Sequence, residues 1–108
     1  MNIHDERDAY VIHDGSIILD VNAAFCRLFR CERDQVVDRS LFDLIADEDL
    51  KHLGRLRMGI LTRTGRNLPD VLYSFLRFDG SIFWGEGHTT GTDRKTVYES
   101  RIKLLNEV

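Results

Sequence analysis

Hydrophobic and polar residues follow two different periods along this chain, and the positions where the period changes divide it into three parts. Residues 9–13 and 16–20 are rich in apolar and β-branched residues and flank an Asp-Gly pair, a strong signal of a β-hairpin. The sequence therefore predicts a hairpin that leads directly into a short amphipathic helix. The apolar positions that carry the helical spacing are Val21, Ala24, Phe25, Leu28 and Phe29.

The junction between the hairpin and this helix contains neither glycine nor proline, so a tight turn is expected there. Asp20 and Asn22 are both short polar residues whose side chains can accept a hydrogen bond from an unpaired N–H group of the first helical turn. The start of the apolar period favours Asp20 as the cap. Asn22 is the alternative.

The middle of the chain is expected to be helical. Apolar residues arrive in pairs between charged residues over 31–46, which predicts single helical turns, with Ser40 and Asp43 at the spacing of a capping box. A longer helix is predicted from about Asp47 to Arg63, opened by acidic residues and ended by Gly65. Its apolar stripe is expected to consist of Leu50, Leu53, Leu56, Ile60 and Leu61.

Two glycines, Gly54 and Gly59, lie inside this longer helix, where each costs about 1 kcal/mol relative to alanine. One interpretation is that a ligand or a neighbouring backbone packs close to them. The other is that the cost is simply tolerated.

The part after Pro69 has the period of β-strands. Runs 71–78, 81–90 and 96–105 are rich in β-branched and aromatic residues and are separated by turn sequences, which predicts an antiparallel meander. The first run is apolar on both faces, so its second face needs a cover such as a helix, a partner subunit or another part of a longer protein. The face expected to be covered in this way carries Leu72, Leu76 and Phe78.

The order of two strands, a block of helices and three strands predicts the α+β class, with both ends of the chain paired in one five-stranded antiparallel sheet. A chain of 108 residues is expected to form a single domain over 1–108, with its core at about 9–105. The net charge of −3 argues against direct nucleic-acid binding. No apolar run is long enough to cross a membrane, and the first residues are polar and acidic, so we expect a cytoplasmic protein.

Cys26 and Cys31 have no second cysteine pair and no histidine at metal-binding spacing near them, so no metal site is expected. Two reduced thiols are favoured over a disulfide. A redox-sensing pair is the alternative interpretation.

Several segments in this order resemble a PAS domain, a small sensory and signalling module. They are "DGSIILDVNAAFCRLFRCERDQVVDRSLFDLI", "ADED" and "FDGSIFW", and the resemblance extends from about Ala9 to Leu105. It implies a five-stranded antiparallel sheet with short helices and one longer helix on one face, and it favours Asn22 as the helix cap. Two departures are Asp38, where the family often has glycine, and "KLLNEV", which lacks the family's Asp-Ile-Thr segment.

Members of the family bind cofactors such as flavin or haem. We expect neither of these two in this chain, so its cofactor is unknown. Flavin photosensors of this family carry a reactive cysteine in a segment that corresponds here to Ser40-Leu41-Phe42-Asp43, which has no thiol. Haem-binding relatives use a histidine on the longer helix, but His52 falls on its polar side. Glu86 and His88 share a strand face with Trp84 and could form an acid-base pair, yet nothing marks a nucleophile, so no enzyme is predicted.

The resulting functional hypothesis is a sensory module that binds a small ligand between helices and sheet and relays its state to an effector, such as a kinase, a cyclase or a DNA-binding domain, in the same or a partner chain. The alternative is a ligand-free domain that forms a homodimer through Leu72, Leu76 and Phe78. A homodimer is expected in either case. The predicted pocket residues are Phe25, Leu28, Phe29, Leu41, Leu44, Leu53, Leu56, Ile60, Tyr73, Phe75 and Trp84.

Overall fold

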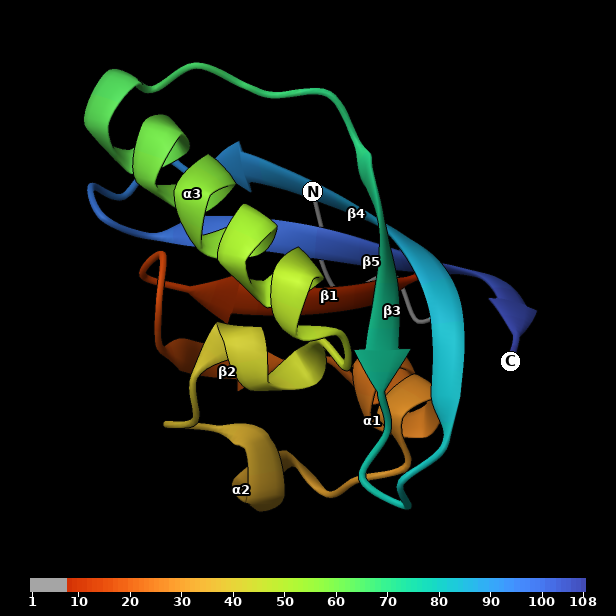
Figure 1. Cartoon of the computed structure of the whole chain (residues 1–108). Helices are drawn as coiled ribbons and strands as arrows, with labels where there is room; N and C mark the ends of the chain where they lie inside the picture. The colour runs from red at the N-terminus through yellow and green to blue at the C-terminus, as the bar shows by residue number, and fades with distance from the viewer. Residues whose placement is uncertain (1–7) are drawn as a thin grey trace.

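The computed structural model describes residues 8–108 and consists of a five-stranded antiparallel sheet with helices on one face (Figure 1). The strand order is β2-β1-β5-β4-β3, so strands from the two ends of the chain pair at the centre. This confirms the predicted fold class. The elements are β1 (Ala9–His13), β2 (Ile18–Val21), α1 (Ala23–Phe29), α2 (Arg33–Val36), η1 (Leu41–Leu44), α3 (Glu48–Thr64), β3 (Val71–Leu76), β4 (Ile82–Gly91) and β5 (Tyr98–Glu107).

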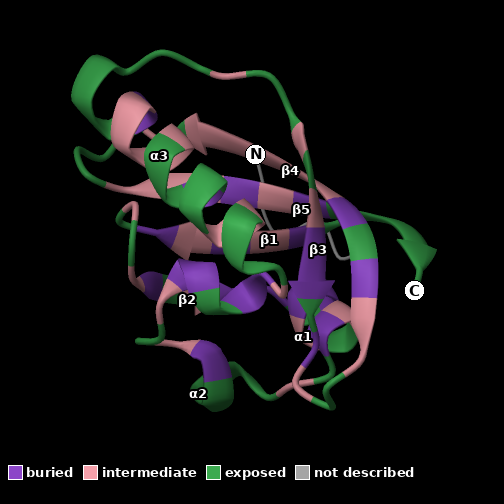
Figure 2. Cartoon of the chain, in the orientation of Figure 1, coloured by how far each residue is buried: buried purple, intermediate pink, exposed green. Residues whose placement is uncertain are grey.

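The helix α3 crosses in front of β4, β5 and β1, and the short helices continue the same layer toward β2 (Figure 1). We call the sheet face toward α3 the inner face and the opposite face the outer face. The buried residues concentrate between the helices and the inner face, whereas much of the surface of α3 that points away from the sheet is exposed (Figure 2).

The strand β2 passes into α1 through a single residue, Asn22. Its backbone is extended, and its side-chain Oδ1 accepts a hydrogen bond from the Phe25 N–H at 3.0 Å, so Asn22 is the cap. Asp20, the cap favoured by the apolar period, instead accepts from the Val21 N–H and pairs with Arg33. Val21 is the last residue of β2, so its apolar side chain belongs to the sheet and the helical period begins two residues later.

The predicted single helical turns are present as α2 and η1. Ser40 caps η1 by accepting from the Phe42 N–H at 3.2 Å, but Asp43 does not complete a capping box and lies near Arg39. Asp38, one of the two departures from the resemblance, has a left-handed backbone with φ of 74°. Asp38 therefore carries a backbone conformation that favours glycine.

The helix α3 has nearly the predicted ends, with Asp47 as its N-cap and Gly65 as its C-cap, but its orientation differs from the predicted one. Leu53 and Leu56 are 37% and 61% exposed, whereas Gly54 and Leu61 are buried. The reason is close packing at Gly54: a Cβ atom added there would lie 3.2 Å from the Ile45 Cδ1 atom. The helix approaches η1 through its glycine, which turns the leucines on either side outward.

The second glycine of α3 has no such role. A Cβ atom added at Gly59 would meet only the far end of the Arg63 side chain. Close packing therefore occurs at Gly54, but against the side chains of Ile45, Phe42 and Tyr73 rather than a backbone. The tolerated-cost interpretation holds for Gly59.

The outer face of β3 is apolar, as predicted, but the residues that form it differ from the predicted set. Leu72 and Leu76 are exposed there, and Trp84 of β4 lies between them because it pairs with Ser74. Phe78 lies beyond the end of β3, where it is half-buried, its N–H donates to the Phe29 carbonyl, and the Arg39 guanidinium lies over its ring. Phe78 therefore does not belong to the outer face.

Candidate functional site

A cavity of about 80 Å³ lies between α3, η1 and the inner face of the sheet. Its wall is mainly apolar, with a small number of polar side chains, which is the usual composition of a small-molecule site. The lining residues are Leu41, Phe42, Leu44, Ile45, Gly54, Arg57, Met58, Leu61, Leu68, Pro69, Tyr73, Phe75, Gly87, Thr89, Ser100 and Ile102.

Two glycines of β4 shape the floor of this cavity. A Cβ atom added at Gly85 would lie 3.0 Å from the Phe75 ring, and one at Gly87 would lie 3.3 Å from the Tyr73 ring. Both aromatic rings therefore reach from β3 over the glycines of β4, inclined to each other at 62°. Thr89 is the next residue of β4 on this face, since side chains alternate along a strand, and it begins the polar wall.

The polar wall is a hydrogen-bonded chain across three strands. Thr89 of β4 bonds to Ser100 of β5 with an oxygen-to-oxygen distance of 2.6 Å, and Ser100 Oγ bonds to His13 Nε2 of β1 at 2.7 Å. The Gly15 N–H donates to His13 Nδ1 at 3.0 Å, so the proton of the neutral ring is on Nε2. His13 therefore donates to Ser100.

His13 is completely buried, and this burial determines its charge. Burial lowers the pKa of His13 to about 4, an effect that the neighbouring Asp14 carboxylate opposes in part. The imidazole is neutral near pH 7. The Tyr98 ring stacks on it, with 6.0 Å between the ring centroids.

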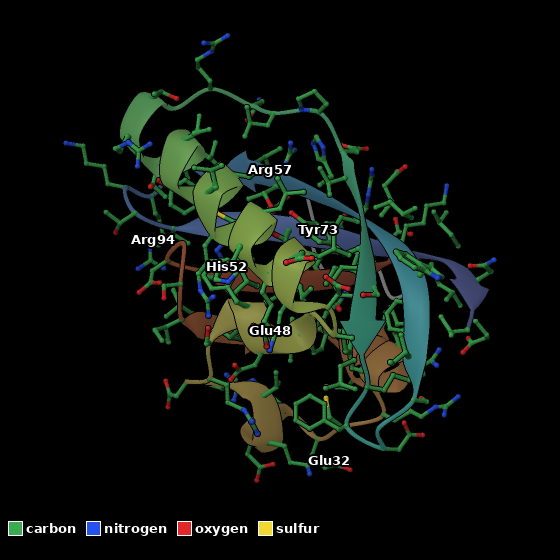
Figure 3. All side chains as sticks on the ribbon, in the orientation of Figure 1. Glu32, Glu48, His52, Arg57, Tyr73 and Arg94 are labelled. Carbon is green, nitrogen blue, oxygen red and sulfur yellow. The ribbon has the colours of Figure 1, made fainter. Side chains whose placement is uncertain are left out.

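Arg57 and Tyr73 form the other polar part of the cavity. Arg57 comes from α3 and Tyr73 from β3, and both lie in the space between the helix and the strand (Figure 3). An Arg57 N–H donates to the Pro69 carbonyl, and the guanidinium also contacts the Tyr73 hydroxyl. Burial raises the pKa of Tyr73, which keeps the phenol protonated near pH 7.

The structure brings together only some of the residues predicted for the pocket. Leu41, Leu44, Tyr73 and Phe75 line the cavity. Leu53 and Leu56 point away from it for the reason given for Gly54, and Trp84 lies on the outer face. The other predicted residues, Phe25, Leu28, Phe29 and Ile60, do not line it.

Sequence reasoning missed the polar residues of the cavity. Thr89 follows Gly85 and Gly87 at alternating positions, and this Gly-x-Gly-x-Thr pattern was a usable signal of a strand face that larger groups lie against. His13 and Ser100 are separated by most of the chain and meet only because β1 pairs with β5. No local pattern marks that contact.

The cavity does not fit either of the cofactors considered. No cysteine or histidine is among its lining residues, all of which belong to the described part of the chain. His52 is exposed on the outward side of α3 (Figure 3). A flavin adduct would lack its thiol here, and a haem iron would lack its histidine ligand.

The two thiols lie elsewhere, on and just after α1. Burial raises the pKa of Cys31 to about 12 and also raises that of Cys26, so both thiols are protonated and weakly nucleophilic near pH 7. Over residues 8–108, no cluster of three or more potential metal-binding side chains is found.

Glu86 and His88 lie on the outer face, because β4 alternates and Gly85, Gly87 and Thr89 face inward. His88 Nδ1 bonds to the Asp70 carboxylate, and this bond lowers the pKa of Asp70. The pair joins the loop before β3 to β4 and is remote from the polar wall of the cavity. Glu86 and His88 therefore do not form an acid-base pair in the cavity.

The fold and the cavity together define an α+β class in which helices close one face of an antiparallel sheet over a small, mainly apolar space. The family model described as "PAS domain" matches residues 7–102. The chain belongs to the PAS domain family. PAS domains with this fold occur in a transcriptional regulator of the LuxR family and in a two-component sensor histidine kinase.

Solved structures give the same fold. The PAS domain of a LuxR-family transcriptional regulator from Burkholderia thailandensis, in complex with ethanol, has a TM-score of 0.75 and 20% identity over 94% of this chain and 92% of that one. The PAS domain of an HTR-like protein from Haloarcula marismortui has a TM-score of 0.76 and 15% identity, covering 94% and 84% of the two chains.

A third similar structure is a blue-light activated histidine kinase from Erythrobacter litoralis, with a TM-score of 0.77 and 20% identity. It matches 97% of this chain and 37% of the kinase. The comparison with curated proteins finds no match. Within residues 8–108, no helix has the length and apolar character needed to cross a membrane.

Proposed function

We propose that this PAS domain senses a small molecule that binds in the cavity between α3 and the sheet, and that it relays the bound state to an effector in the same or a partner chain. The observation that carries the proposal is the hydrogen-bonded chain from the cavity wall at Thr89, through Ser100, to His13 and Gly15 in the β1–β2 hairpin. A ligand that bonds to this wall acts on three strands at once.

The size of the cavity and one structural neighbour support this proposal. A volume of about 80 Å³ corresponds to a few water molecules or a small organic molecule. The similar domain from Burkholderia thailandensis is in complex with ethanol, a molecule of this size. PAS domains are generally sensory rather than enzymatic, and we propose no reaction for this one.

The test combines native mass spectrometry of the purified protein with an NMR titration using ethanol. A bound small molecule, or shifts of the Thr89 and Ser100 amide signals, is expected for the unchanged chain. The substitution Met58→Phe enlarges a side chain of the cavity wall and is expected to abolish both signals. An empty protein whose cavity amides do not respond to ethanol would contradict the proposal.

A second proposal is that the outer face forms a homodimer. The exposed side chains of Leu72, Leu76 and Trp84 are neighbours on that face, and contiguous exposed apolar groups often mark an interface. Analytical ultracentrifugation tests it: Trp84→Glu is expected to raise the dimer dissociation constant at least about tenfold. Leu56→Glu, at an exposed leucine of α3, is the matched control, and an equal loss in both variants would exclude this face.

A further inference from the structure

The polar wall of the cavity has one hydroxyl hydrogen that finds no acceptor among residues 8–108. His13 supplies the hydrogen for its bond to Ser100, because Gly15 already occupies the other ring nitrogen. The bond between Ser100 and Thr89 uses one of their two hydroxyl hydrogens. The second hydrogen has no acceptor among the hydrogen bonds of the described residues, and both residues line the cavity.

This count does not depend on which hydroxyl donates to the other. If Ser100 donates, the Thr89 hydrogen is left over, and if Thr89 donates, the Ser100 hydrogen is left over. Ser100 is only 6% exposed, so a leftover Ser100 hydrogen lies away from bulk water, whereas Thr89 is half-buried. An unpaired buried donor is costly, and a ligand with an acceptor oxygen in the cavity would remove that cost.

The charges around the cavity favour an anionic acceptor. Arg57 is the only charged residue among those that line it. No carboxylate of residues 8–108 forms a salt bridge with Arg57, whose named partners are the Pro69 carbonyl and the Tyr73 hydroxyl. A guanidinium carries five N–H groups, so donors remain for a ligand.

Arg57 and the hydroxyl pair are connected through neighbouring residues. The Tyr73 ring lies on Gly87, and Thr89 is the next residue of β4 on the same face. The Tyr73 hydroxyl in turn contacts Arg57. Arg57 adjoins the Tyr73 ring, and the Thr89–Ser100 pair follows one position further along β4 on the same cavity face, while the apolar side chains of Ile45, Leu61 and others form the remaining wall.

From these observations we propose that the ligand is a short-chain carboxylate whose oxygens accept from Arg57 and from the Thr89–Ser100 hydroxyl pair, with its hydrocarbon chain against the apolar wall. This proposal rests on the proposed function, since it assigns a chemical class to the molecule sensed. The cavity volume of about 80 Å³ suits a chain of about two to four carbons.

The test is isothermal titration calorimetry with four probes of similar size at matched ionic strength: sodium butyrate, butyramide, 1-butanol and butylammonium chloride. Butyrate is expected to bind at least about tenfold more tightly than the two neutral probes, and butylammonium is expected not to bind. Arg57→Gln is expected to remove the preference for butyrate while binding of butyramide changes little. Arg63→Gln, an exposed arginine of the same helix, is the matched control.

The hydroxyl pair makes a separate prediction. Thr89→Val alone is expected to change butyrate affinity less than about threefold, because the Ser100 hydrogen is then released toward the cavity. Thr89→Val combined with Ser100→Ala removes both hydroxyls and is expected to weaken binding about tenfold. If that double variant does not fold, the comparison of Arg57→Gln with Arg63→Gln still tests the assignment.

The outcomes separate the two proposals. If 1-butanol and butyramide bind as tightly as butyrate, and Met58→Phe abolishes their binding, the carboxylate assignment is overturned while the cavity stays a ligand site. If none of the probes binds and the purified protein is empty, both proposals fail.

Discussion

The core under the sheet has two halves that are packed very differently. In the half under α1, three phenylalanines, Phe25, Phe29 and Phe83, are completely buried, and the ring centroids of Phe29 and Phe83 are 5.3 Å apart. In the half under α3, the helix buries only Gly54 and Leu61 and leaves the cavity. The same sheet therefore carries a filled half that stabilises the fold and an open half with polar groups.

The difference follows from the residue types that each helix turns toward the sheet. α1 directs aromatic rings inward from a short helix that is capped tightly against β1. α3 approaches η1 through a glycine, so Leu53 and Leu56 point outward and no aromatic ring of this helix fills the space beneath it. A tightly filled half holds the strands in place, which lets the other half keep a cavity without loss of the fold.

The largest expected effect tests the filled half. Phe29→Ala removes a ring that contacts Phe25, Phe75 and Phe83, and it is expected to lower the free energy of unfolding by about 3–5 kcal/mol. Met58→Ala, in the wall of the cavity, is expected to cost about 1 kcal/mol, because Met58 is partly exposed and borders space already. Urea denaturation measures both, and equal losses would contradict the division into two halves.

The second prediction concerns the junction that anchors α1. Asn22 Oδ1 accepts from the Tyr10 N–H as well as from Phe25, and its Nδ2 donates to the Asp8 carbonyl. Asn22→Leu is therefore expected to cost about 2–3 kcal/mol, the sum of a lost cap and an unpaired strand N–H group. Thermal and urea unfolding test this.

Asp20→Ala is the control for that substitution. Its ion pair with Arg33 is exposed, so a loss of only about 0.5 kcal/mol is expected. A larger loss for Asp20→Ala than for Asn22→Leu would show that the cap does not hold α1 to the sheet.

These two residues also show how far the sequence could predict the molecule. The strand and helix order, and the ends of α3, follow from local periodicity and end signals, and the structure confirms them. The apolar period alone selected Asp20 as the cap, because it counted Val21 as helical although Val21 closes a strand. A residue that ends one element and precedes another fits both periods, and only the backbone decides.

The cavity was less accessible to sequence reasoning. The spacing of apolar residues placed Leu53 and Leu56 on the face of α3 toward the sheet. A glycine is not counted as apolar in such a pattern, so the close packing at Gly54 could not be recognised. The polar wall joins His13, Thr89 and Ser100 through the register of β1, β5 and β4. Long-range strand pairing is not written in any one segment, so this wall could not be assigned before the fold was known.

The third prediction uses pH to test the polar wall of the open half, through His13. Burial lowers the pKa of His13 from 6.5 to about 4, so the unfolded chain takes up a proton at a higher pH than the folded chain does. The stability that this neutral histidine contributes is complete above about pH 6.5 and is lost progressively toward pH 4. Between about pH 7 and pH 5.5 the free energy of unfolding is expected to fall by about 1 kcal/mol.

His13→Gln is the comparison for this pH effect, since it removes the titrating ring and keeps a side-chain N–H group. Urea denaturation at several pH values is expected to give a flatter profile for the variant over this range. The pKa values of the Asp14, Asp70 and Glu107 carboxylates are lowered, so these groups take up protons below this pH range. A profile that is equally steep in both proteins would show that another group is responsible.

The smallest expected effect concerns the outward side of α3. Leu56→Gln changes a side chain that is 61% exposed, so the free energy of unfolding is expected to change by less than about 0.5 kcal/mol. The same substitution at Leu61, which is 5% exposed and lines the cavity, is expected to cost about 2 kcal/mol or more, because it buries an amide without a partner. The two substitutions change helix propensity equally. The difference between their losses of unfolding free energy therefore reports which side of α3 faces the sheet. If Leu56→Gln were the more destabilising of the two in urea, α3 would present its leucines to the sheet, and the open half would instead be filled.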